Sequence, residues 1–148
     1  TGDCPLIDPT TIDSVVVPVD DGRAVYASNI SQRTFPRGLD VEVFTAESFE
    51  TVASAATTKA EREHVTPYYR QTPTEFETEN VTSDQVFEQE KYIERSDLRL
   101  TLDEPDDYHL LERIYDMIEY DDILPVREAI DLVDVEGLSE INESVQQK

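Results

Sequence analysis

Apolar residues recur along the chain in two rhythms, one typical of helices and one typical of strands. Spacing of three or four residues, introduced by capping residues or proline, predicts helices at 8–16, 45–56, 59–70, 104–118, 125–133 and 137–145. Alternation at every second residue predicts strands at 26–29, 39–44 and 98–103. The helix at 59–70 is expected to break or kink at Pro67, and residues 76–90 are expected to form a strand or hairpin.

Strands that alternate with helices are typical of α/β proteins. We therefore predict a three-layer α/β sandwich with a largely parallel sheet, formed by a single domain over residues 1–148. The helix at 104–118 has an apolar stripe that is expected to face the core, made of Tyr108, Leu111, Ile114, Tyr115 and Ile118.

The chain is strongly acidic, with 34 Asp and Glu residues against 12 Lys and Arg and a formal net charge of −22. This charge repels phosphates, so nucleic acids and anionic membranes are excluded as partners. About a quarter of the residues are Leu, Ile, Val or Phe, which is enough to expect a packed core. The carboxylates are spread over the whole chain, and this favours adaptation to high salt over an acidic protein with one specific basic partner.

The sequence contains no apolar run long enough to span a bilayer and no basic, apolar segment at its start, so a soluble cytoplasmic protein is expected. Cys4 is the single cysteine, which excludes an internal disulfide. With two histidines beside it, a cluster of Cys and His ligands is also excluded. Any metal ion must therefore be held by oxygen ligands.

Two segments share one design, in which an apolar strand ends in an aspartate and is followed by a proline-containing turn. Asp3 and Asp103 are these aspartates. Ligands of open α/β sheets bind at the carboxyl ends of strands. Two carboxylates there would offer Mg²⁺ hard oxygen ligands while leaving positions for water and phosphate oxygens. The alternative is that each aspartate caps the helix that follows it.

Several blocks of the chain, in this order, carry a family resemblance: residues 1–9, Ser28-Asn29 with 33–44, 62–68, 100–107, and Ile141-Asn142 with Gln147-Lys148. Together they resemble the cytidylyltransferase family of spore-coat polysaccharide biosynthesis proteins, relatives of the CMP-Kdo and CMP-sialic acid synthetases. The resemblance implies a GT-A-like nucleotidyltransferase fold and transfer of CMP from CTP to a sugar or sugar acid, with release of pyrophosphate. It also implies Mg²⁺ held by Asp3 and Asp103, and a possible homodimer.

One feature of that family is missing from the chain. The family begins with a Gly- and Arg-rich loop, followed by a Lys, that cradles the triphosphate of CTP. The chain has four glycines and no such loop before Asp3. We therefore expect it to be the C-terminal portion of a nucleotidyltransferase, without the N-terminal nucleotide-binding segment and inactive by itself. The alternative is a non-catalytic α/β module of the same family that binds or assembles with a partner.

Charged residues near the strand at 39–44 are candidates for binding the sugar. Arg33 and Arg37 are expected in one loop, where guanidinium groups would bind a sugar carboxylate or phosphate, or else form surface ion pairs. Asp40 and Glu42 share a strand face and would accept hydrogen bonds from sugar hydroxyls, or else form an ordinary solvated face.

Asn29 and His64 complete the substrate-binding candidates, because both lie in blocks that the family shares. The alternative for His64 is a structural role. No residue is assigned a catalytic role from the sequence.

Overall fold

The computed structural model describes residues 2–59, 62, 66–72 and 75–145. A small mixed sheet lies at its centre, with β1 (Tyr26–Ser28) between β2 (Glu42–Phe44) and β3 (Thr78–Asn80). Strand β1 runs antiparallel to β2 and parallel to β3. The mixed α/β class is confirmed, but the expectation of a largely parallel sheet is wrong for the described residues, since one of the two strand pairs is antiparallel.

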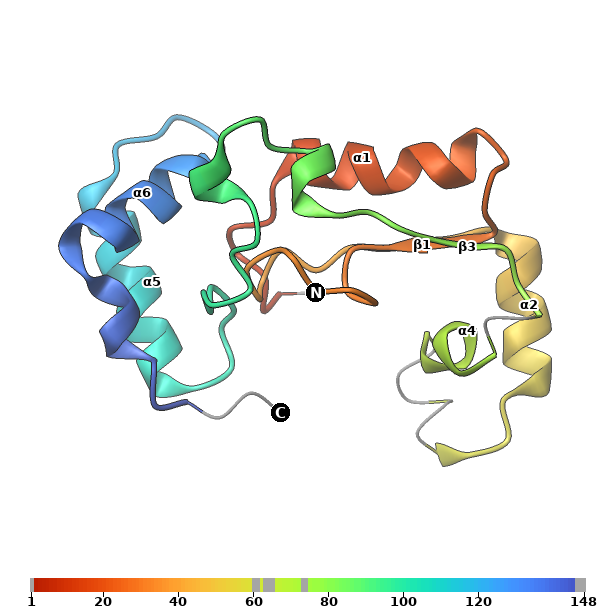
Figure 1. Ribbon diagram of the computed structural model, residues 1–148. Helices are drawn as coiled ribbons and strands as arrows, with labels where there is room; N and C mark the ends of the chain where they lie inside the picture. Colours follow the sequence, from red (N-terminus) through yellow and green to blue (C-terminus); the bar gives the residue numbers. More distant parts are fainter. Residues whose placement is uncertain (1, 60–61, 63–65, 73–74, 146–148) are drawn as a thin grey trace.

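Five α-helices surround this sheet in the described part of the chain: α1 (Pro9–Asp20), α2 (Ala46–Ala55), α4 (Pro67–Gln71), α5 (Pro105–Met117) and α6 (Val126–Glu136). Three short 3₁₀ helices are η1 (Ser83–Gln85), η2 (Glu90–Tyr92) and η3 (Leu138–Ile141). Figure 1 shows α1 running along one face of the sheet, α2 and α4 near one end of the strands, and α5 and α6 near the other. No helix among the described residues is long and apolar enough to cross a membrane.

The predicted starts of α1 and α2 are confirmed by their caps. The Asp8 carboxylate accepts a hydrogen bond from the Thr11 amide at 2.8 Å, and Pro9 occupies the first turn of α1, where its missing N–H costs nothing. The Thr45 hydroxyl accepts from the Ser48 amide at 3.2 Å and so begins α2. Local capping chemistry is sufficient to place both helices.

Residues 98–103 do not form a strand of the sheet, although their alternation predicts one. The segment is extended, but its backbone pairs with a loop: the Arg37 amide donates to the Leu98 carbonyl at 3.0 Å, and the Leu100 amide donates to the Arg37 carbonyl at 2.7 Å. Further along, the Leu102 amide donates to the Asp3 carbonyl at 2.9 Å. The partners of this segment are therefore single loop residues instead of a neighbouring strand.

Three other predicted elements differ in extent. The described part of 59–70 includes α4, which begins at Pro67 instead of kinking there. Residues 76–90 contain strand β3 followed by η1, and 137–145 contain η3 where a helix of α type was expected. Gly137 has a φ of 67° and ends α6, so the chain leaves the helix in a left-handed turn.

The buried face of α5 is rotated from the predicted stripe. Leu111 and Ile114 are buried as expected, but Tyr108 is 52% exposed and Asp107 is completely buried in its place. The sequence pattern assigned the tyrosine to the core because it is apolar. The structure buries the neighbouring aspartate, because Asp107 has hydrogen-bond partners inside the protein.

The core consists of three apolar clusters. The largest joins α5 and α6 to loop residues that include Phe35, Leu39 and Leu100. A second lies between α1 and the sheet, and the third contains Tyr26 stacked on Tyr69 with ring centroids 4.6 Å apart. The first two clusters contain Phe35, Leu39 and Val41, which lie in segment 33–42. This segment carries four of the candidate site residues: Arg33, Arg37, Asp40 and Glu42.

Candidate functional site

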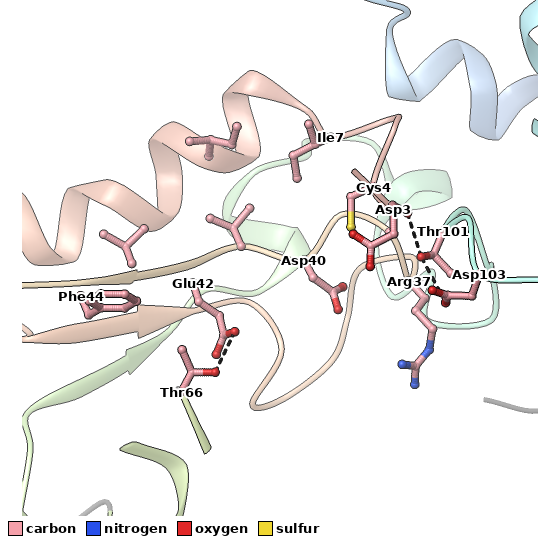
Figure 2. Close-up of a pocket in the computed structure, with 14 residues that line it drawn as sticks. Asp3, Cys4, Ile7, Arg37, Asp40, Glu42, Phe44, Thr66, Thr101 and Asp103 are labelled. Carbon is pink, nitrogen blue, oxygen red and sulfur yellow. Dashed lines mark hydrogen bonds between the residues drawn. The ribbon is translucent and has the colours of Figure 1, made fainter. Parts of the chain in front are cut away.

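An open pocket of about 640 Å³ collects five of the side chains that the sequence analysis selected. These are Asp3, Arg37, Asp40, Glu42 and Asp103. Figure 2 shows Asp3, Arg37 and Asp103 at one end of the pocket and Glu42 at the other, with Asp40 between the two ends. The pocket thus brings together charged residues that are separated by up to 100 positions in the sequence.

Asp3 and Asp103 lie together because the backbone of Asp3 is hydrogen-bonded to Thr101 and Leu102, the two residues before Asp103. The Thr101 hydroxyl and the Leu102 amide both donate to the Asp3 carbonyl, each at 2.9 Å. The Oδ1 atom of Asp3 is buried. On Asp103, the Oδ2 atom accepts a hydrogen bond from Arg99 at 3.0 Å, and about half of the side chain is exposed. The two carboxylates therefore line the same end of the pocket.

Asp3 and Asp103 are the two carboxylates at this end of the pocket that would hold a magnesium ion. Among the described residues, no group of three or more His, Cys, Asp and Glu side chains could hold a metal ion. Mg²⁺ is commonly bound through one or two carboxylates, however, and takes its other ligands from water and substrate phosphates. The N-cap residues of α1 and α5 are Asp8 and Glu104, so helix capping does not account for Asp3 and Asp103.

A buried cluster of Arg99, Asp107 and Asn142 lies behind Asp103. The Arg99 guanidinium donates two hydrogen bonds to the Asp107 carboxylate, both at 2.8 Å, and the Asn142 amide donates a third at 2.9 Å. The backbone amides of Asp103 and Glu104 also donate to Asp107, at 3.1 and 3.0 Å. Burial alone would raise the pKa of Asp107, but these hydrogen bonds outweigh it and lower the pKa to about 2.

The sequence analysis did not select this cluster, although Asp107 and Asn142 both lie in blocks of the family resemblance. A usable signal was present for Asp107, which is an acidic residue in the first turn of a helix that begins with proline. No sequence signal connects it with Asn142, 35 residues away, because that contact is purely tertiary.

The two arginines of the loop have different environments. Arg33 forms a bidentate ion pair with Asp40, with N–O distances of 2.6 and 2.9 Å, and this hydrogen bonding raises the pKa of Arg33. Arg33 does not line this pocket and forms the local ion pair that was the alternative, while its contact with substrate stays a prediction. Arg37 does line the pocket, and its pKa is lowered by burial and by the nearby Arg33 and Arg99. The carboxylates of Asp40 and Asp103 also lie near Arg37 and act in the opposite direction, so Arg37 faces the pocket among charges of both signs.

Glu42 is held at the other end of the pocket by three donors. Its carboxylate accepts hydrogen bonds from the Tyr26 hydroxyl, from the Thr66 hydroxyl at 3.0 Å and from Arg70 at 3.2 Å. Burial and the hydrogen bond to Glu42 raise the pKa of Tyr26, so the phenol keeps its proton and remains a donor. The Thr66 contact is drawn in Figure 2. Glu42 therefore has a fixed orientation at the wall of the pocket.

Asn29 is buried and hydrogen-bonded to the backbone, and its contact with substrate stays a prediction. It is 1% exposed and does not line the pocket. Its amide donates to the Leu39 carbonyl at 2.7 Å, and its carbonyl accepts from the Val41 amide at 2.8 Å. Asn29 thereby holds the backbone on both sides of Asp40. The other predicted contact, His64, lies outside the described residues.

Three comparisons relate the chain to known proteins. The model of the cytidylyltransferase family matches residues 1–130. Uncharacterized protein MJ1063 of Methanocaldococcus jannaschii is 34% identical over 154 residues, which cover 100% of this chain and 57% of that protein. The structure of a cytidylyltransferase from Leptospira borgpetersenii serovar Hardjo-bovis superimposes with a TM-score of 0.80 at 29% identity, over 100% of this chain and 58% of the other. The chain thus spans less than two thirds of either relative.

Proposed function

Because the chain belongs to the cytidylyltransferase family, we propose that it forms the sugar-binding part of an enzyme that transfers CMP from CTP to a sugar or sugar acid. In this reaction a sugar hydroxyl oxygen forms a bond to the α-phosphorus of CTP and gives up its proton to water. The bond from that phosphorus to the oxygen that bridges to the β-phosphate breaks, and pyrophosphate leaves. The observation that carries the proposal is the convergence of Asp3 and Asp103 in one pocket with Arg37, Asp40 and Glu42.

In this proposal the two ends of the pocket have different tasks. Asp3 and Asp103 would hold Mg²⁺, which supplies positive charge against the phosphate oxygens of the nucleotide. Arg37 would bind an anionic group of the substrate through its guanidinium. Asp40 and Glu42 would accept hydrogen bonds from sugar hydroxyls, and their ion pairs with Arg33 and Arg70 hold both carboxylates in a fixed orientation.

The triphosphate of CTP, in the same proposal, is held by the part of the longer relatives that this chain does not span. The resemblance to spore-coat polysaccharide proteins extends the proposal to the synthesis of a surface polysaccharide or glycan. The GT-A-like nucleotidyltransferase fold, with its three-layer sandwich, is likewise part of the proposal.

The test is pyrophosphate release by the natural full-length protein. The protein is incubated with Mg²⁺, one of the four nucleoside triphosphates, and a panel of neutral sugars, amino sugars and sugar acids. We expect release with CTP and one class of sugar, and a loss of at least about 100-fold in kcat for Asp103→Asn. Asp116→Asn removes the same charge from the exposed side of α5 and serves as the control.

Two outcomes would contradict the proposal. If CTP gives no pyrophosphate with any sugar while the protein is folded, the non-catalytic module becomes the better explanation. If Asp103→Asn and Asp116→Asn have equal activity, Asp103 is not part of the reaction site.

A further inference from the structure

We infer that Asp107 is a positioning residue, which acts with Arg99 and Asn142 to fix both the backbone and the carboxylate of Asp103 at the pocket. This inference rests on the proposed function, because it concerns how the proposed metal site is held in place. Asp107 does not itself line the pocket. Its effect on a bound metal ion must therefore pass through Asp103.

Direct contacts connect Asp107 with both parts of Asp103. Its Oδ2 atom accepts the backbone amide of Asp103 at 3.1 Å, which fixes the peptide that carries the aspartate. The same Oδ2 atom accepts from Nη2 of Arg99 at 2.8 Å, and this Nη2 also donates to Oδ2 of Asp103 at 3.0 Å. One guanidinium nitrogen is thus shared between the buried carboxylate and the carboxylate at the pocket.

The burial of these groups argues for a role in positioning. Only 7% of the Arg99 side chain and none of the Asp107 side chain is exposed, whereas 48% of the Asp103 side chain is. A half-exposed aspartate would otherwise change rotamer readily, so a rigid buried partner restricts it. Stability alone does not explain a buried ion pair, because the cost of removing both charges from water can exceed the gain from their attraction. Apolar residues of similar volume often give the same stability.

Helix capping does not explain the whole cluster. To begin α5, Asp107 needs only to accept the backbone amide of the N-cap residue Glu104, as in a capping box. Asn142, which directly follows η3, adds contacts of its own. Its side-chain amide donates to the Arg99 carbonyl at 3.0 Å and to Oδ1 of Asp107 at 2.9 Å. Residues that hold metal ligands in this way commonly change metal affinity by 10- to 100-fold when they are replaced.

The experiment measures Mn²⁺ binding to the natural full-length protein in the presence of CTP, by electron paramagnetic resonance of the free ion. Asp103→Asn, Asp107→Asn and the double variant are compared, and Tm is recorded for each. We expect each single variant to weaken Mn²⁺ binding at least about 10-fold. The double variant should bind no more weakly than Asp103→Asn, because Asp107 acts through Asp103.

Asp134→Asn is the matched control. Asp134 forms a bidentate pair with Arg95, at 2.9 and 2.8 Å, and neither residue lines the pocket. This variant is expected to lower Tm and to leave Mn²⁺ binding unchanged. Should Asp107→Asn fail to fold, Asn142→Ala takes its place under the same criteria, since it removes one donor and leaves the pair of Arg99 with Asp107 intact.

The outcomes separate this inference from the proposed function. Wild-type Mn²⁺ affinity in folded Asp107→Asn, or additive effects in the double variant, would overturn the positioning role alone. Wild-type affinity in Asp103→Asn would show that the proposed metal site is wrong, and the positioning role would fall with it.

Discussion

Gly38 packs directly against the backbone of Leu100, leaving no space for a side chain. A Cβ added at Gly38 would lie 2.5 Å from both the carbonyl carbon and the carbonyl oxygen of Leu100, and the φ of Gly38 is 102°. This contact joins the loop of Arg37 and Asp40 to the segment that ends in Asp103. The shape of the pocket therefore depends on a residue that carries no functional group.

Gly38→Ala is expected to destabilise the protein by more than about 2 kcal/mol, because it adds a backbone clash to the strain of a positive φ. Gly22→Ala separates the two effects, since Gly22 has a φ of 70° but no atom within 4 Å of the added Cβ. Its cost should be about 1 kcal/mol. Denaturant unfolding of both variants measures the difference, and equal losses would mean that the clash is relieved without cost.

The stability that Asp107 provides should disappear in acid. Its pKa in the folded protein is about 2, below the usual 3.8, so its contribution is complete above about pH 4 and is lost as the pH falls towards 2. The shift corresponds to about 2 kcal/mol. The difference in unfolding free energy between wild type and Asp107→Asn should therefore shrink between pH 5 and pH 2.5. A difference that stays constant with pH would contradict the low pKa.

Arg37→Ala should impair binding of the sugar selectively. If Arg37 contacts an anionic group of the sugar, its removal costs about 1.5–3 kcal/mol, which raises the KM for the sugar by about 10- to 100-fold and leaves the KM for CTP nearly unchanged. Steady-state kinetics of the full-length protein measure both constants. Arg113→Ala, on the exposed side of α5, is the control. An equal rise in both KM values, or no rise in either, would contradict the assignment of Arg37 to the sugar.

The stability of the protein should increase with salt. A net charge of −22 creates repulsion between carboxylates, and the screening length falls from about 10 Å at 0.1 M salt to about 3 Å at 1 M. We expect Tm to rise steadily with potassium chloride up to molar concentrations. A Tm that does not depend on salt would remove the support for adaptation to a saline environment.

Short-range chemistry in the sequence was sufficient for the starts of α1 and α2 and for the charged residues that line the pocket. Asp8 and Thr45 cap helices because a side-chain oxygen and the amide that it accepts lie three residues apart. The strand-end design of Asp3 and Asp103 selected two carboxylates that do line one pocket. Their role in metal binding stays a prediction, as does any role of His64.

Tertiary structure decided which polar side chains face the pocket and which are used inside the protein. Alternation cannot show that Asn29 bonds to the backbone beside Asp40, or that Arg33 pairs with Asp40 while Arg37 turns to the pocket. Nor can periodicity show that α5 buries Asp107 and exposes Tyr108, because Asp107 has hydrogen-bond partners inside the protein in Arg99 and in Asn142, the latter 35 residues away. Capping and periodicity act within a few residues, whereas these choices depend on partners that only the folded chain brings together.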